Sequence, residues 1–189
     1  MDTANLQPTL WRTCRVLANR KRLEILRLLL RQPGQTVSSV AQRIRLPISS
    51  TSEQLRALEA RGLLVAQRTG RWVKYAPSSA AHPSFSTTLV AVMQPLFLLD
   101  KQALDHIYGM VTAFTHPSRI LIFRTLRLQP HDLLQLQTAS HISRRALLRH
   151  LHKLEARGFI TKHGAFFLAE KRTDPIGREL ARLAVLQNG

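Results

Sequence analysis

The chain has 189 residues, of which 44% are hydrophobic, enough for two small domains that each bury a core. Lys and Arg number 28 against 11 Asp and Glu, so the formal net charge is +17 and we expect a polyanionic partner, either nucleic acid or an anionic membrane. One cysteine, Cys14, excludes an intramolecular disulfide and favours a reducing compartment.

The N-terminus carries no signal-peptide pattern, and the most apolar stretch is residues 89–99. That stretch contains Gln94 and Pro95, ends before Asp100 and is too short to span a bilayer. We therefore expect a cytoplasmic protein that does not associate with membranes. Residues 89–99 are expected to form a core or interface helix.

The first part of the chain predicts four helices. Asn19 is a favourable N-cap for the second helix, and Ser38 for the third, which follows a short strand at residues 36–37. Leu46 and Pro47 form the turn before the fourth helix, so the last two helices predict a helix-turn-helix. The predicted helices are residues 8–18, 20–30, 39–45 and 48–61.

A β-hairpin is predicted directly after these helices. Gly62 ends the fourth helix, and residues 63–68 and 72–76 alternate as two strands around a turn at residues 69–71. Residues 77–83 form a polar connector.

A long helical region is predicted over residues 84–114. Pro95 is expected to break it or to start a new helix, and Gly109 is a weak point.

The last part of the chain predicts the same order of elements. Pro117 occupies the first position of a helix, Ser143 is expected to cap a later helix by accepting a backbone hydrogen bond, and Gly158 ends that helix. Asp174 opens a C-terminal helix. The predicted helices are residues 117–126, 132–139, 144–157 and 175–186, and the predicted strands are residues 159–162 and 165–169.

Two blocks of sequence recur at a nearly fixed spacing. The motif LEARG occurs twice, so that Leu154 lies 96 positions after Leu58, and Arg119 lies 97 positions after Arg22. A repeat of this length indicates two copies of one fold rather than a solenoid, which needs at least three short units. We therefore predict a tandem duplication with copy one at residues 1–82, linking helices at 83–115 and copy two at 116–189.

The motif strings resemble the ArsR/SmtB-type bacterial repressors. QRTGRWVKYAP at residues 67–77 is similar to the wing of that family, and SRRALLRHLHKLEARGFI at residues 143–160 is similar to its recognition helix. The resemblance implies a mainly α fold with small β-hairpin wings, made of two winged helix-turn-helix domains that form a pseudo-dimer. Family members are usually homodimers that pack through their first and last helices. The resemblance also implies that His150 packs at the turn.

The thiolate metal sites of that family are not matched by this sequence. They need paired cysteines before the recognition helix, and residues 36–39 and 132–135 contain none. Of the eight histidines, His150 and His152 are two positions apart on a helix and cannot chelate one ion together. We expect no metal and no cofactor, with a histidine-based zinc or nickel site as the alternative.

Enzyme motifs are also absent from the sequence. It contains no glycine-rich phosphate loop, no HExxH and no nucleophile elbow, and its acidic residues are scattered. We expect no catalytic activity.

The resemblance implies that each recognition helix enters the major groove of double-stranded DNA while the wings contact the backbone or the minor groove. Each candidate residue has a phosphate contact or plain solvent exposure as its alternative, and Glu53 would repel phosphate. The candidate DNA-binding residues are Ser49, Ser50, Ser52, Gln54, Arg68, Arg71, Lys74, Arg144, Arg145, Arg149 and His152.

Two further groups of apolar residues have a structural and a functional interpretation. Trp72 and Tyr75 are expected to cover the small sheet, with base stacking as the alternative. The stretches 89–99 and 180–186 are expected to be core, with an effector pocket as the alternative.

The hypothesis is a sequence-specific transcriptional regulator of double-stranded DNA, a repressor, with two non-identical recognition helices. The alternatives are a non-specific DNA-coating protein of the nucleoid type and a protein-interaction adaptor on a winged-helix scaffold. Two chains could also associate into a further homodimer, and the sequence does not identify an effector.

Overall fold

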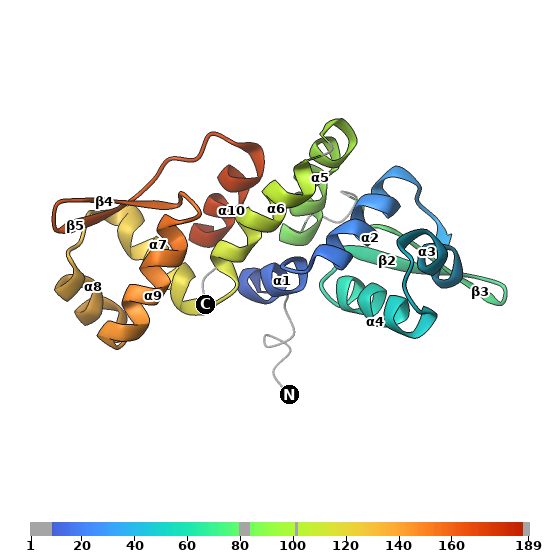
Figure 1. Ribbon diagram of the computed structural model, residues 1–189, viewed down its shortest axis with the longest axis horizontal. Coiled ribbons are helices and arrows are strands. Elements are labelled where there is room, and N and C mark those ends of the chain that lie inside the picture. Colours follow the sequence, from blue (N-terminus) through green and yellow to red (C-terminus); the bar gives the residue numbers. More distant parts are fainter. Residues whose placement is uncertain (1–8, 80–83, 101, 187–189) are drawn as a thin grey trace.

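The protein is an elongated molecule with a β-hairpin towards each end and helices between them (Figure 1). The computed structural model describes residues 9–79, 84–100 and 102–186. Ten α-helices, one 3-10 helix and two small antiparallel sheets lie within these residues, so the fold is mainly α, consistent with winged helix-turn-helix units. None of the helices in these residues is long and apolar enough to cross a membrane. Part of the predicted connector, including His82, lies outside the described residues.

The N-terminal unit consists of four helices and a three-stranded sheet. Its elements are α1 (Leu10–Leu17), α2 (Arg20–Arg31), β1 (Gln35–Thr36), α3 (Val37–Ile44), α4 (Ile48–Glu59), β2 (Leu64–Thr69) and β3 (Trp72–Pro77). The predicted cap at Asn19 is confirmed, because its side-chain oxygen accepts a hydrogen bond from the N–H of Arg22 at 3.1 Å. Strand β3 lies between β1 and β2 in the sheet, and both pairings are antiparallel.

Helix α3 begins two residues before the predicted start, and its cap is Thr36 rather than Ser38. The Oγ1 atom of Thr36 accepts a hydrogen bond from the N–H of Ser39 at 3.3 Å. Thr36 is also the last residue of β1 and pairs with Lys74, so the sheet fixes the extended backbone that an N-cap needs. The helix ends at Arg45, whose φ of 57° is left-handed.

The linking region contains two α-helices and a short 3-10 helix. These are α5 (Phe85–Leu99), α6 (Ala103–Val111) and η2 (Thr112–Phe114). The prediction that Pro95 breaks the helix or starts a new one is wrong, because Pro95 lies exposed inside α5. The opposite face of α5 buries Leu89, Met93 and Phe97, and this packing holds the helix together although Pro95 donates no hydrogen bond.

The C-terminal unit repeats the plan of helices followed by a hairpin. Its elements are α7 (Pro117–Leu128), α8 (Leu133–Ser140), α9 (Arg144–Glu155), β4 (Ile160–His163), β5 (Phe166–Ala169) and α10 (Pro175–Leu186). The predicted first position of Pro117 is confirmed. Gly158 has the left-handed φ of 68° expected after a helix, three residues beyond the end of α9 at Glu155. Ser143 does not make the predicted cap hydrogen bond with its side chain, although it does precede α9.

The two units correspond element by element. Helix α7 begins 97 positions after α2, whereas α8, α9 and β4 each begin 96 positions after α3, α4 and β2. One hydrogen bond recurs with the same geometry: Arg22 Nε donates to the carbonyl oxygen of Val16 at 2.5 Å, and Arg119 Nε donates to that of Ala113 at 2.5 Å.

The linking region packs against the first helix of the N-terminal unit and the last helix of the C-terminal unit. Helix α1 contacts η2 and α6, and α5 contacts α10. Arg20 in α2 forms an ion pair with Asp105 in α6 and lies over the ring of Tyr108 at 4.9 Å. The buried apolar residues of both units therefore belong to one connected core.

Candidate nucleic-acid interface

Helix α9 places the four predicted basic residues on an exposed face. Arg144, Arg145, Arg149 and His152 are all exposed, while Leu147, Leu151 and Leu154 are buried against the rest of the C-terminal unit. This division follows the helical period, because residues three and four positions apart share a face. Leu148 is 45% exposed among these cations, which makes it an apolar group on the same surface.

Helix α4 presents a polar face with no exposed cation near its start. Ser49 and Glu53 are exposed, and Ser50 and Ser52 are half-buried. Gln54 is less available than the sequence predicts, because its Oε1 atom accepts a hydrogen bond from Arg22 Nη1 at 2.9 Å. The two helices that occupy corresponding positions therefore carry different chemistry.

The β2–β3 hairpin forms a wing whose cations point in different directions. Arg68, Arg71 and Lys74 are all exposed. Lys74 pairs with Gln67 in the sheet, and Arg68 pairs with Val73, so Arg68 and Lys74 lie on opposite faces of the ribbon. Arg71 lies in the turn, where its guanidinium is 5.3 Å from the centroid of the Trp72 ring.

The predicted covering of the sheet by two aromatic residues is half right. Tyr75 is 6% exposed and packs in the core, and burial, followed by the charge of Glu59, raises its pKa. Trp72 is 51% exposed at the tip of the wing, since it faces the side of the ribbon that carries Lys74. The expected packing of Trp72 is therefore wrong.

A cluster of histidines and arginines lies where α9 meets the start of α7. His150 is buried, and its ring lies 4.7 Å from that of His116. His116 Nδ1 accepts a hydrogen bond from the N–H of Ser118 at 3.1 Å and caps α7. Burial, together with the positive charges of Arg119 and Arg149, lowers the pKa of His116, and burial lowers that of His150 to about 4.

A basic group on α1 is absent from the sequence prediction. The guanidinium groups of Arg12 and Arg15 lie 5.2 Å and 5.8 Å from the centroid of the Trp11 ring. In Figure 1, α1 lies between α4 and α9, and the three helices lie in the lower half of the molecule. The sequence predicted a helix over residues 8–18 but gave it no role, although the spacing of Arg12 and Arg15 puts both on one helical face.

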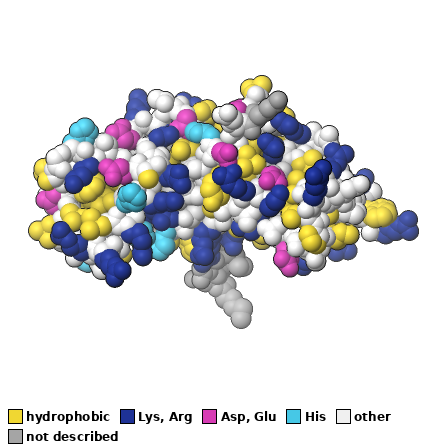
Figure 2. Space-filling view, viewed as in Figure 1, with side chains coloured by type: hydrophobic (Ala, Val, Ile, Leu, Met, Phe, Trp, Pro, Cys, Tyr) yellow, Lys and Arg dark blue, Asp and Glu magenta, His cyan; other side chains and the backbone are white. Residues whose placement is uncertain are grey.

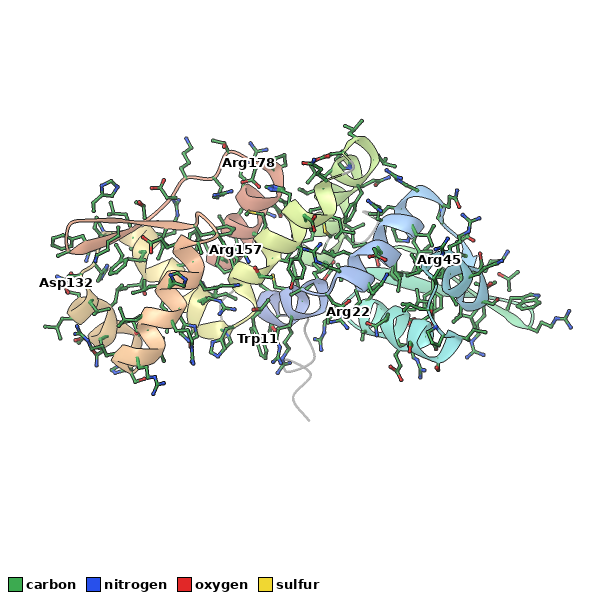
Figure 3. All side chains as sticks on the ribbon, viewed as in Figure 1. Trp11, Arg22, Arg45, Asp132, Arg157 and Arg178 are labelled. Carbon is green, nitrogen blue, oxygen red and sulfur yellow. The ribbon has the colours of Figure 1, made fainter. Side chains whose placement is uncertain are left out.

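The lower edge of the molecule is rich in cations. Dark-blue Lys and Arg side chains recur along it in Figure 2, and Figure 3 shows Trp11 there between the two units. Helices α4, α1 and α9 all lie towards this side of the molecule.

No group of three or more His, Cys, Asp or Glu residues that could hold a metal ion occurs within the described residues. Cys14 is fully buried in α1, and burial raises its pKa. The thiol is therefore held in its protonated form.

Comparison with protein families identifies a helix-turn-helix domain at residues 17–67, from the end of α1 into β2. No protein of established function matches the chain. The matched stretch contains α3, its turn and α4, which are the helices that the sequence predicts as a helix-turn-helix. A helix-turn-helix domain points to a DNA-binding regulator.

Proposed function

We propose that this protein is a sequence-specific transcriptional repressor of the ArsR/SmtB type that binds double-stranded DNA with two winged helix-turn-helix copies in one chain. The observation that carries the proposal is the exposed face of α9. Three arginines and His152 project from a helix that follows a turn and precedes a hairpin. Arginine suits this role because its fork matches guanine O6 and N7 in the major groove.

A tandem duplication is part of the proposal. It is supported by the nearly constant spacing of 96 or 97 positions between corresponding elements and by the hydrogen bonds from Arg22 to Val16 and from Arg119 to Ala113. An arginine that satisfies the carbonyl oxygen six residues before it, at the same place in both units, is a detail that two unrelated folds would not share.

The proposal treats the two copies as an internal pseudo-dimer. This is supported by the packing of α1 on η2 and α6, and of α5 on α10. Helix α1 is the first helix of the N-terminal unit and α10 is the last helix of the C-terminal unit, and homodimers of the resembling family associate through their first and last helices. The arrangement leaves α4 and α9 free on one edge (Figure 1).

The two recognition helices are proposed to bind unlike half-sites. Helix α9 offers Arg144, Arg145 and Arg149, which favour guanines, whereas α4 offers serines and Glu53. Glu53 carries the same sign of charge as phosphate, and Gln54 already bonds to Arg22. We therefore assign most of the sequence discrimination to α9 and a weaker reading to α4.

Neither catalysis nor a resident metal is included in the proposed function. Cys14 is assigned to the core rather than to a sensor site because its side chain is fully buried and its pKa is raised.

Selection of bound sequences from a random duplex pool tests the proposal. We expect an enriched site with two different halves whose centres are about one helical turn, roughly 34–36 Å, apart. Affinity is expected to fall steeply with salt, with a slope in log K against log salt of about −0.9 for each phosphate that is neutralised. Binding without enrichment would identify a non-specific coating protein, and no binding at low salt would identify an adaptor.

A further inference from the structure

A cavity of about 320 Å³ lies between α7, α10 and the segment that joins β5 to α10. It lies within the C-terminal unit and is separate from the faces of α4 and α9. Figure 3 shows Arg178 on the edge of the molecule opposite to Trp11. The lining residues are Phe123, Arg127, Glu170, Lys171, Arg172, Arg178, Ala181, Arg182, Val185 and Leu186.

Part of the lining of the cavity is apolar. Phe123 on α7 is fully buried, and Ala181 and Val185 line the side formed by α10. The α10 residues that line the cavity recur at helical spacing, so one whole face of this helix borders it. The opposite face of α10 is packed into the core through Leu180, Leu183 and Ala184.

The corresponding positions of the N-terminal unit are filled with leucine. Phe123 and Arg127 on α7 lie 97 positions after Leu26 and Leu30 on α2, and both leucines are buried. At the second position, copy two therefore has a long cation in place of a leucine that closes the core in copy one. The cavity is thus a local departure from the repeated plan.

The mouth of the cavity is positively charged. Arg172 is held by Asp174, with Nη2 2.6 Å from Oδ2, and Arg182 is held by Glu179, also at 2.6 Å. Arg127, Lys171 and Arg178 make no ion pair within the described residues, and Glu170 is the only acid in the lining. The unpaired groups leave an excess of positive charge above an apolar floor.

We propose that this cavity binds a small carboxylate with an apolar body, such as a medium-chain or arylalkyl carboxylate. Its volume is at the lower end of the range for small-molecule sites, roughly 300–1,000 Å³. The apolar body occupies the space beside Phe123 and Ala181, and the carboxylate meets Arg127 or Arg178, each of which can donate two parallel hydrogen bonds. Apolar burial and charge pairing then act at opposite ends of one ligand.

Binding at this site bears on the packing of the two units. Helix α10 contacts α7 and also α5 and α6 of the linking region, so a ligand bound between α7 and α10 acts on the helix that packs the C-terminal unit against that region. Arg124 also fixes the end of α10, since its Nε donates to the carbonyl oxygen of Ala184 at 2.6 Å. The binding claim itself does not depend on the proposed DNA function.

The test is isothermal titration of the full chain with octanoate at about physiological salt, where screening over roughly 8 Å weakens non-specific attraction. Matched titrations use octan-1-ol, octylammonium, butyrate and 4-phenylbutyrate. We expect saturable one-to-one binding of octanoate, binding at least tenfold weaker for octan-1-ol and butyrate, and none for octylammonium. Binding of 4-phenylbutyrate in place of octanoate would assign the site to arylalkyl carboxylates.

Two variants locate the site. Arg178→Gln removes a cation from the mouth and should weaken octanoate binding about tenfold, whereas Arg27→Gln, which removes an arginine of α2, should leave it unchanged. Ala181→Trp fills the cavity and should abolish binding. Each variant is melted without ligand, and Val185→Trp replaces Ala181→Trp if the latter fails to fold.

Three results would overturn the proposal. The first is that no carboxylate shows saturable heat. The second is that octan-1-ol binds as tightly as octanoate. The third is that the filled variants bind like the unaltered chain.

Discussion

The imidazole ring of His150 lies against that of His116, with ring centroids 4.7 Å apart and planes inclined by 33°. The Nδ1 atom of His150 is buried without a hydrogen-bond partner in the described residues. Burial, followed by His116, Arg119 and Arg149, lowers the pKa of His150 to about 4 from an ordinary value near 6.5. Between about pH 4 and pH 6.5, His150 is therefore neutral in the folded protein, whereas the same histidine is protonated in the unfolded chain.

The free energy of unfolding should consequently fall as the pH drops from about 6.5 to 4. In that window the unfolded state binds more protons than the folded state, and the loss from one such group is on the order of 1–3 kcal/mol. His150→Gln, which installs the residue found at the corresponding Gln54, should reduce the pH dependence measured by urea unfolding. His163→Gln, at an exposed position of the second hairpin, should leave it unchanged. An unaltered dependence in His150→Gln would contradict the assignment.

Arg145→Ala should weaken DNA binding in one half-site only. Arg145 is exposed on α9, and loss of a base contact by such an arginine costs about 1–3 kcal/mol. The measurement is affinity for the selected duplex and for duplexes mutated in either half. Arg71→Ala should instead weaken binding to all duplexes by a similar factor, because a wing residue contacts the backbone. If Arg145→Ala also weakened binding to all duplexes by a similar factor, the proposal that α9 discriminates between sequences would be contradicted.

The thiol of Cys14 should be inert in the folded protein and reactive only after unfolding. It is fully buried, and burial raises its pKa, so little thiolate forms near neutral pH. A colorimetric thiol reagent added with and without urea measures this. The Cys14→Ser variant should bind DNA with the affinity of the unaltered protein. Neither arsenite nor cadmium should change the DNA affinity of either protein. A metal response that disappears in Cys14→Ser would show that Cys14 acts as a sensor.

Asp174→Asn should destabilise the protein at neutral pH by about 1–2 kcal/mol, because it removes the charge from two hydrogen bonds with Arg172. Burial alone would raise the pKa of Asp174, but the N–H of Gly177, together with Arg172 and His106, outweighs it and the pKa is lowered. The carboxylate therefore stabilises the fold above the ordinary aspartate pKa, and this contribution is lost as the pH falls through the lowered pKa. Urea unfolding should show that the difference in the free energy of unfolding between Asp174→Asn and the unaltered protein is smaller near pH 2 than at pH 7. Asp105→Asn, in an exposed ion pair, should change stability by less than about 0.5 kcal/mol.

Residues with strong local preferences made much of the fold predictable. Asn19 and Pro117 mark helix starts, and Gly158 marks a helix end, because each position needs a backbone geometry that few residues favour. The repeated LEARG motif fixed the correspondence of α4 with α9. The exposed face of α9 was predictable because the apolar residues of this segment recur at the helical period.

Features that depend on distant partners were not predictable in this way. Pro95 continues a helix because the opposite face is buried, and Thr36 caps α3 because a sheet partner 38 positions later fixes its backbone. The hydrogen bond from Arg22 to Gln54 joins two helices, so neither sequence neighbourhood reveals it. The cavity beside Phe123 likewise exists only once α10 lies on α7.

The packing of α1 on η2 and of α5 on α10 joins segments of one polypeptide. Its formation is therefore a unimolecular step that does not weaken on dilution, unlike the association of separate subunits. This contact is therefore present in every folded chain, however few copies a cell holds. For the regulator proposed above, occupancy of an unsaturated site by single chains would rise in proportion to protein concentration, without the threshold that subunit association imposes on a dissociable dimer.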